Sequence, residues 1–218
     1  MPLVAPAAGW LSEIATARAR LERDLERGLP LGADVAPRLG ALLDRVVDWG
    51  RHLDLTAART PQELVDQYLA DALVIAALEP PDDPSPWIDV GSGGGAPALT
   101  LALLRPDASL TLVEPRTRRA AFLRAAAAAV EARQVTVARQ RSEVLPAGAW
   151  RVALSRATLP PDRWLAEGAR LASGAVWVLL GRGARPTHAR ARPTHDVRYR
   201  LPFTGAERRA VRYEVIDR

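Results

Sequence analysis

The chain has 218 residues, of which 48% are hydrophobic and 25% charged, so it is long enough for one full-sized core and has the composition of a soluble globular protein. No apolar run approaches the roughly 20 residues of a membrane span, and the N-terminus lacks a charged region followed by an apolar core, so we expect a cytoplasmic protein. The sequence contains no cysteine and no lysine, which excludes disulfides, thiolate metal sites, cysteine nucleophiles and lysine-dependent mechanisms, and we expect no metal.

The positive charge is concentrated near the C-terminal end of the chain. All 30 basic residues are arginine, as is typical of a GC-rich genome, and the net charge is +5. Residues 182–218 contain ten arginines and four acidic residues, a net charge of +6, so residues 1–181 sum to −1. A basic segment on a nearly neutral body indicates a polyanionic partner; the alternative is a solvated basic loop.

The first 86 residues are predicted to form a small helical region. Apolar residues three or four positions apart predict amphipathic helices at 10–28 and 36–49. A third helix is predicted at 60–78, because Thr60 can cap its first turn and is followed three residues later by a glutamate. The proline-rich stretch 80–86 then ends the helical region and serves as a linker.

From residue 87 to the C-terminus the pattern changes to alternating strands and helices. We predict parallel strands at 87–90, 110–114, 135–138, 152–155 and 175–180, with helices at 97–104, 116–132 and 161–171. This alternation predicts an α/β fold with a doubly wound, mostly parallel sheet. Strands at 196–201 and 210–216 are expected to close it as an antiparallel hairpin. The repeated Arg-Pro-Thr-His at 185–188 and 192–195 argues against helix, and we expect an exposed basic loop there.

The stretch from Trp87 to Ala96 is the most informative part of the sequence. A short apolar run carrying Asp89 leads into a glycine-rich turn and then into a helical pattern. Glycine allows positive φ at a tight turn and removes the Cβ that would hold a nucleotide-like ligand away. The residues expected to lie under that ligand are Asp89, Gly91, Ser92, Gly93 and Gly95.

A second acidic residue, Glu114, is expected at the carboxyl end of the neighbouring strand, where such sheets bind ligands. Together with the first acidic residue it favours S-adenosylmethionine (SAM) as cofactor, with Glu114 accepting hydrogen bonds from the ribose hydroxyls. Ser142 and Glu143 follow the third strand, where the adenine ring is usually held. The segment 91–96 also fits the dinucleotide pattern G-x-G-x-x-A. That alternative is weaker, because such domains usually open with the motif and here some 85 residues precede it.

The residue types that are missing narrow the methyl acceptor. Transfer to pyrimidine C5 normally needs a cysteine adduct, and transfer to a ribose 2′-hydroxyl commonly uses a lysine. Transfer to an exocyclic amino group usually needs a motif that the segment 155–162 does not match. A ring nitrogen with a free lone pair, such as guanine N7, needs neither a general base nor a nucleophile. The missing residue types therefore favour N7 chemistry or a small-molecule acceptor.

Several short motifs, in the right order, resemble the glucose-inhibited division protein B family of small-subunit ribosomal RNA guanine-N7 methyltransferases. The resemblance runs from about Leu39 to the C-terminus. Its motifs are Trp49-Gly-Arg-His-Leu-Asp-Leu-Thr56, Tyr68-Leu-Ala-Asp-Ala-Leu73, Asp89-Val-Gly-Ser-Gly-Gly-Gly-Ala-Pro97, Leu104-Arg-Pro-Asp107, Arg118-Arg-Ala-Ala-Phe-Leu123, Arg141-Ser-Glu143 and Ser155-Arg-Ala157.

This resemblance implies the fold, the cofactor, the partner and a set of site residues. The fold is that of a class I SAM-dependent methyltransferase, with residues 87–218 as the SAM-binding domain. The partner is 16S rRNA or the small ribosomal subunit, and we expect the protein to be a monomer. The residues implied to contact SAM are Gly91, Ala96, Ser142, Glu143 and Arg156. The residues implied to lie near RNA are Arg118, Arg119 and Arg156; a solvated helix face is the alternative for the first two.

The chain departs from the family pattern at several positions. Ala96 and Ala98 replace a bulky residue and a glycine after the turn, and Asp54, Tyr68 and Ala72 replace an asparagine, a histidine and a serine. The Lys-Gly after the fifth strand reads Gly181-Arg182, so Arg182 is expected to supply the charge toward RNA, although its planar guanidinium is not equivalent to an ammonium. Two alternatives follow: a methyltransferase with a changed acceptor, or a non-catalytic protein of the same fold that binds RNA or a partner.

Overall fold

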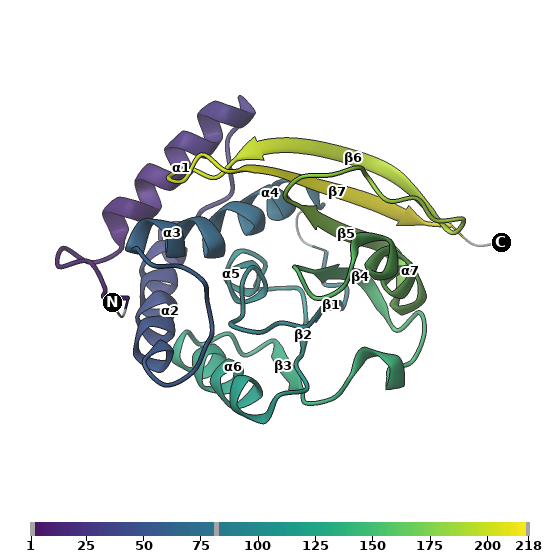
Figure 1. Cartoon of the computed structure of the whole chain (residues 1–218), viewed down its shortest axis with the longest axis horizontal. Helices are drawn as coiled ribbons and strands as arrows, with labels where there is room; N and C mark the ends of the chain where they lie inside the picture. The colour runs from purple at the N-terminus through teal and green to yellow at the C-terminus, as the bar shows by residue number, and fades with distance from the viewer. Residues whose placement is uncertain (1–2, 81–82, 217–218) are drawn as a thin grey trace.

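A seven-stranded sheet forms the centre of the computed structural model, which describes residues 3–80 and 83–216 (Figure 1). The strand order is β3-β2-β1-β4-β5-β7-β6; the first five strands are parallel, and β7 and β6 are antiparallel. The strands are β1 (Trp87–Val90), β2 (Leu110–Val113), β3 (Val135–Ala138), β4 (Trp150–Ser155), β5 (Ala172–Leu180), β6 (Ala191–Arg200) and β7 (Glu207–Val215). The expected doubly wound α/β fold with a C-terminal hairpin is confirmed.

The helices are α1 (Leu11–Leu25), α2 (Val35–Gly50), α3 (Pro61–Val65), α4 (Asp71–Leu78), α5 (Ala98–Leu104), α6 (Thr117–Ala129) and α7 (Pro161–Leu171). The single helix expected at 60–78 is interrupted by a π-helical turn, η1 (Asp66–Ala70), between α3 and α4. The predicted start is confirmed, since Thr60 Oγ1 accepts a hydrogen bond from the Glu63 amide at 3.2 Å. In the described ranges, none of the helices is long and apolar enough to cross a membrane.

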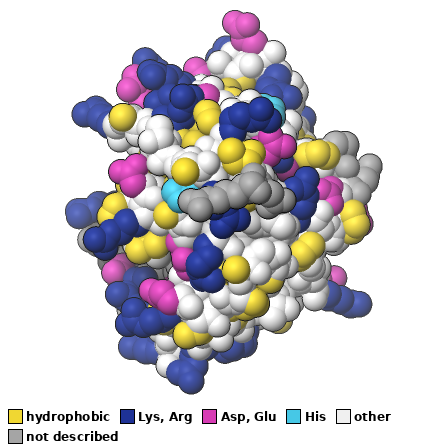
Figure 2. Space-filling model, turned by 90° about the vertical axis from the view of Figure 1, so that its right-hand side faces the viewer, with side chains coloured by type: hydrophobic (Ala, Val, Ile, Leu, Met, Phe, Trp, Pro, Cys, Tyr) yellow, Lys and Arg dark blue, Asp and Glu magenta, His cyan; other side chains and the backbone are white. Residues whose placement is uncertain are grey.

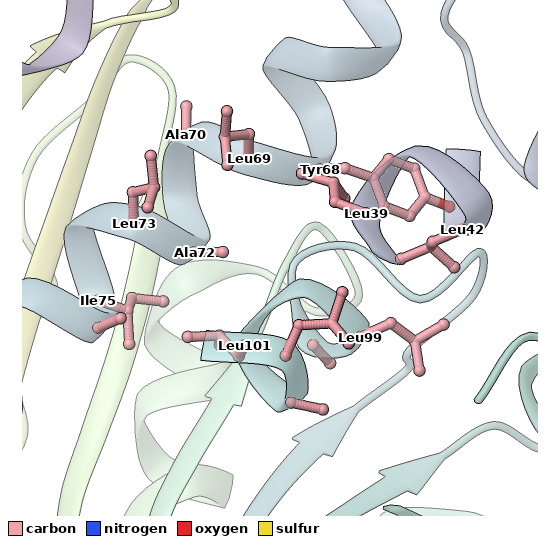
Figure 3. Packing of buried hydrophobic residues seen from close by; sticks show 14 of the residues in the cluster. Leu39, Leu42, Tyr68, Leu69, Ala70, Ala72, Leu73, Ile75, Leu99 and Leu101 are labelled. Carbon is pink, nitrogen blue, oxygen red and sulfur yellow. The ribbon is translucent and has the colours of Figure 1, made fainter. Parts of the chain in front are cut away.

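The helices cover the two faces of the sheet unequally. Helix α7 packs against β4 and β5 and builds a smaller core with one face of the sheet. The other face carries α5 and α6; α2 packs onto both of these and α4 onto α5, while α1 packs onto α2, α3, η1 and β6. Figure 3 shows this contact: side chains of α2, of η1 and α4, and of α5 meet in one apolar cluster. The N-terminal helices and the sheet therefore share a single large core.

The C-terminal hairpin begins earlier than expected. The second Arg-Pro-Thr-His copy, at 192–195, lies within β6 and not in a loop, which corrects that part of the prediction. Pro193 is tolerated because β6 is the edge strand and its register with β7 shifts between Pro193 and His195. Residues 181–190 form no helix, as expected, and the first copy, at 185–188, stays outside the strands.

The hairpin is anchored on the N-terminal helices, beside which it lies in Figure 1. The Asp66 carboxylate accepts hydrogen bonds from the amides of Phe203 and Thr204, at 3.0 and 2.9 Å, in the β6–β7 turn. The Arg200 amide donates to the carboxylate of Asp24 in α1 at 2.8 Å. These contacts place the tip of the hairpin beside the π-helical turn, and so beside the carboxyl ends of the parallel strands.

Candidate functional site

The glycine turn follows β1 and is held by its neighbours. Gly91 has φ +73°, and a Cβ at this position would overlap the side chain of Thr158. The amides of Gly91 and Ser92 both donate to the Val113 carbonyl, at 2.8 and 3.1 Å. Gly95 has φ +88°, and a Cβ there would lie 2.5 Å from Leu99 Cδ1. Positive φ and close packing explain why the sequence has glycine at both positions.

Gly93 differs from these two glycines because it faces open space. Its φ is +54°, and a Cβ there would meet nothing closer than the Gly91 carbonyl at 3.7 Å. Its amide donates to Glu114 Oε2 at 3.1 Å, while Glu114 Oε1 accepts from the Arg116 amide at 2.8 Å. The backbone at Gly93 is thus a cradle that a bound molecule can approach closely, with an oriented carboxylate at its edge.

Asp89 lies behind the turn and is buried. Among the described residues its Oδ2 atom has no hydrogen-bond partner. Burial raises the pKa of Asp89 to about 7, since a carboxylate away from water loses its hydration. A buried carboxylate oxygen without a partner costs free energy until a hydrogen-bond donor or a cation reaches it.

A cavity of about 410 Å³ opens over the turn, within the usual size range of sites for small ligands. Among the residues expected from the sequence, its lining includes Gly91, Ser92, Gly93, Ala96, Glu114, Arg119 and Arg156. Two further expected residues do not line the cavity: Asp89 is buried, and Gly95 packs against Leu99. The structure therefore brings most of the expected cofactor residues around one cavity.

Ser142 and Glu143 do not line this cavity. They begin the 3₁₀ turn η2 (Ser142–Val144) that follows β3. The Ser142 carbonyl accepts a hydrogen bond from the Arg170 guanidinium at 2.8 Å, and the Glu143 side chain is exposed. The structure thus ties Ser142 to α7 and leaves Glu143 facing solvent.

The cavity lining also includes residues that the sequence reasoning did not assign to the site, among them Gln67, Tyr68, Gly94 and Thr158. The Tyr68 hydroxyl donates to the Gly94 carbonyl, and a Cβ on Gly94 would lie 2.5 Å from the Leu55 carbonyl oxygen. Figure 3 shows Tyr68 within the apolar cluster, and burial raises its pKa. The motif containing Tyr68 was visible in the sequence, but its contact with the glycine turn depends on the fold.

Arg156 stands at the edge of the cavity, just after β4. Its Nη1 donates to the Gln67 carbonyl at 2.6 Å and lies 3.5 Å from Asp71 Oδ2. The other carboxylate oxygen, Oδ1, accepts a hydrogen bond from the buried Tyr199 hydroxyl of β6. Burial, with the Asp71 carboxylate next to it, raises the pKa of Tyr199 well above its ordinary value. This network holds Arg156 between the π-helical turn and the sheet.

A second cavity, of about 560 Å³, adjoins the first at the carboxyl ends of β4 and β5. The two cavities share Leu55, Gln67, Arg156 and Ala157 in their linings. Arg182, expected to face RNA, lines the second cavity and not the first. Because Arg156 borders both, a group bound in one cavity lies next to a group bound in the other.

The two neighbouring arginines of α6 bind backbone carbonyls. Arg118 donates to the His52 carbonyl at 3.0 Å, and Arg119 donates to the Asp54 carbonyl at 2.7 Å. Arg119 also lines the cofactor cavity, whereas Arg118 borders a separate hollow beside Trp49. Both side chains thus connect α6 to the segment after α2, and only one of them reaches the candidate site.

Known proteins resemble this chain in both sequence and fold. The model of the GidB family, described as rRNA small subunit methyltransferase G, matches residues 36–193. Ribosomal RNA small subunit methyltransferase G of Myxococcus xanthus is 32% identical over 83% of this chain and 88% of its own length. The protein of that name from Anaeromyxobacter dehalogenans is 35% identical over 74% of this chain and 77% of its own length.

The fold has solved counterparts among methyltransferases. The 1,6-didemethyltoxoflavin-N1-methyltransferase of Burkholderia thailandensis, solved with bound S-adenosylhomocysteine, is similar with a TM-score of 0.53 and 18% identity. The similarity covers 86% of this chain and 92% of that one. The family model matches most of the chain, and the named relatives are similar over most of their length, so the chain belongs to the GidB family, rRNA small subunit methyltransferase G.

Proposed function

We propose that the chain binds SAM in the 410 Å³ cavity and transfers its methyl group to N7 of a guanine in 16S rRNA. The observation that carries the proposal is that the open Gly93 backbone and the oriented Glu114 carboxylate border one cavity, with the buried, partnerless Asp89 oxygen two residues before the turn. Family membership supports the same reaction. The protein would act in the cytoplasm, as a monomer.

The residues of the cavity fit the cofactor. When bound, SAM supplies a methyl group on a sulfonium centre, which a nucleophile can displace in line. Glu114 would accept hydrogen bonds from the ribose hydroxyls, because its two oxygens are already oriented by the amides of Gly93 and Arg116. The glycine turn would lie under the methionine part, with Asp89 nearby to offset its ammonium charge. Ser142 and Glu143 would reach the adenine side only through a movement of η2.

The acceptor guanine would enter the second cavity, beside Arg156. Guanine N7 carries a lone pair and no proton, so no general base is needed and positioning carries the catalysis. Arg156 lies on the border of both cavities and is held by Gln67 and Asp71. Its remaining N–H groups would contact the base or its phosphate. The guanine would have to be unpaired or swung out of its helix to reach this depth.

Two measurements in sequence test the proposal. Calorimetric titration of the purified chain with SAM is expected to give saturable binding in the micromolar range. Incubation with labelled SAM and undermethylated small subunits, or naked 16S rRNA, is then expected to place label on N7 of a guanine. Strand cleavage specific for N7-methylguanine identifies the product. Binding of SAM without labelled rRNA would indicate a changed acceptor. Failure to bind SAM would contradict the proposal and favour a non-catalytic RNA-binding role.

A further inference from the structure

A third cavity lies at the end of the C-terminal hairpin and is strongly basic. It has a volume of about 240 Å³ and is lined by five arginines, against two carboxylates, from the ends of β5, β6 and β7 and from α1. The arginines are Arg182, Arg198, Arg200, Arg208 and Arg209. By contrast, Figure 2 shows arginines spread over another face of the molecule with acidic side chains among them. The clustering of arginines in this cavity therefore indicates an anion-binding site more specifically than the net charge of the chain does.

The charges of this cavity are only partly offset by the protein itself. Arg209 forms a two-pronged ion pair, since its Nε and Nη2 donate to the two oxygens of Asp196, both at 2.6 Å. Arg200 lies 3.9 Å from Glu207, and both side chains are about two-thirds exposed, so this pair contributes little. In the part of the chain that the structure describes, no carboxylate lies within 4.0 Å of the guanidinium groups of Arg182, Arg198 or Arg208.

The strand geometry sets these arginines on a solvent-facing surface. Arg198 and Arg200 alternate along β6 with Tyr199, whose hydroxyl is buried against Asp71. Neighbouring side chains of a strand point to opposite faces, so both arginines face away from the core, and both are exposed. Arg182 follows the end of β5 and is also exposed. The arrangement is held by the β6–β7 pairing and not by mutual contacts of the arginines.

The basic cavity is connected to the proposed acceptor site. It shares Gly181, Arg182 and Arg208 with the 560 Å³ cavity, which in turn shares Arg156 with the cofactor cavity. A single-stranded polyanion crossing the hairpin end thus has a continuous path of adjoining hollows toward the glycine turn. Guanidinium groups in such a position match the geometry of phosphate oxygens, which they bind through paired N–H donors.

We propose that Arg182, Arg198 and Arg200 bind the phosphodiester backbone of the RNA strand next to the methylated guanine. The RNA would then run over the β6–β7 hairpin, while Arg118 of α6 serves mainly to hold the segment after α2. This inference rests on the proposed function for the identity of the polyanion. It extends the charge expected of Arg182 to Arg198 and Arg200 on β6, which no sequence motif indicated.

The test compares two triple variants that remove equal charge. The first is Arg182→Ala, Arg198→Ala and Arg200→Ala; the control is Arg45→Ala, Arg133→Ala and Arg163→Ala, three exposed arginines outside all three cavities. Binding of a labelled single-stranded RNA carrying one guanine is measured by fluorescence anisotropy over a series of salt concentrations. Loss of three phosphate contacts should make the negative slope of log K against log salt less steep by about 2. The affinity for the RNA should then fall roughly a hundredfold at about 0.1 M salt.

The outcomes separate this inference from the proposed function. The control variant should keep the slope of the unmodified protein, and both variants should keep its SAM affinity, because none of the six arginines lines the cofactor cavity. Equal slopes in the two variants would overturn the inference, even if the protein methylates rRNA. A reduced slope in the first variant alone supports it, even if methyl transfer to rRNA is never observed. Replacing the three arginines by lysine should restore most of the slope, since the charge returns.

Discussion

Arg156 Nη1 lies 3.5 Å from Asp71 Oδ2, which connects the loop after β4 to the first residue of α4. The carboxylate is almost fully buried, whereas the guanidinium keeps about a quarter of its surface exposed and faces both cavities. The pair therefore orients an arginine toward the proposed reaction site from a rigid part of the core. It also joins the N-terminal helices to the sheet at the point where the chemistry is expected.

Arg156→Ala is expected to weaken both the fold and the site. Removing the guanidinium leaves the Asp71 carboxylate with the Tyr199 hydroxyl but without its cation, at a cost of about 1–2 kcal/mol in the free energy of unfolding. Because Arg156 lines the cofactor cavity, SAM affinity or methyl transfer should fall as well. Urea denaturation and calorimetry measure the two effects. Arg163→Ala, an exposed change on α7, is the control, and equal behaviour of the two variants would remove Arg156 from the site.

Gly93→Ala should separate ligand binding from stability. The φ of Gly93 is +54° and that of Gly148 is +64°, and neither position has an atom close enough to clash with a new Cβ. Both substitutions to alanine should therefore cost a similar amount of stability, about 1 kcal/mol for the left-handed backbone. Only the methyl group at position 93 enters the cofactor cavity. Overpacking of about 1–3 kcal/mol corresponds to a loss of SAM affinity of roughly 5- to 150-fold.

The melting temperatures and SAM dissociation constants of these two glycine variants provide the measurement. A Gly93→Ala protein that binds SAM as tightly as Gly148→Ala would mean that the ligand does not approach the turn at this point. A much larger loss of stability in Gly93→Ala than in Gly148→Ala would instead contradict the open space found around Gly93.

Asp89 should make the stability of the cofactor-free protein depend on pH. Burial raises its pKa from 3.8 to about 7, so the folded state binds a proton that the unfolded state releases over this range. The contribution of Asp89 to the free energy of unfolding is therefore greatest below about pH 4, declines as the pH rises to about 7, and is constant above that. Asp89→Asn should remove the decline, so that the variant gains stability relative to the parent protein as the pH rises.

Urea denaturation at about pH 5 and about pH 8 measures this difference, with the exposed Asp107→Asn as the control. The stability of Asp89→Asn relative to the parent should improve between the two pH values, whereas that of Asp107→Asn should not. A constant difference between Asp89→Asn and the parent would show that Asp89 is ionised at both pH values in the folded protein.

Two arginines of the hairpin should differ sharply in their contribution to stability. Arg212 pairs with the buried Glu79 at 2.7 Å, with side-chain exposures of 15% and 3%, and the same oxygen accepts from Trp177 Nε1. Arg192 pairs with Glu214 at 2.6 Å, but these side chains are 68% and 45% exposed. Arg212→Ala leaves a buried charge and should cost about 3 kcal/mol or more. Arg192→Ala should cost less than about 1 kcal/mol, because an exposed pair is weak.

Chemical denaturation of the two variants at matched ionic strength gives both values. High salt should reduce the small effect of Arg192→Ala further, and should change that of Arg212→Ala much less, because buried charges are screened less. Similar losses in the two variants would mean that Glu79 gains access to water when Arg212 is removed.

The sequence by itself determined the type and order of the main elements. The five parallel strands and the closing hairpin follow from apolar periodicity and from turn residues, which act over a few neighbouring positions. The glycine turn could also be predicted from a local signal, because positive φ at Gly91 and Gly95 is a property of the backbone at those residues. The acidic residue at 114 could be placed for the same reason, since it ends a strand beside the turn.

Only the tertiary structure decided where the long polar side chains go. The donation of Arg118 and Arg119 to carbonyls at 52 and 54, and the contact of Tyr68 with Gly94, join segments 26 to 66 residues apart. Their directions depend on how α6 and the π-helical turn pack, and no local pattern encodes that. The sequence likewise placed Ser142 and Glu143 after the third strand. It could not predict how far η2 lies from the cavity, because that distance depends on packing. The basic cavity at the hairpin end arises only when β5, β6, β7 and α1 come together, because its arginines are spread over residues 182 to 209.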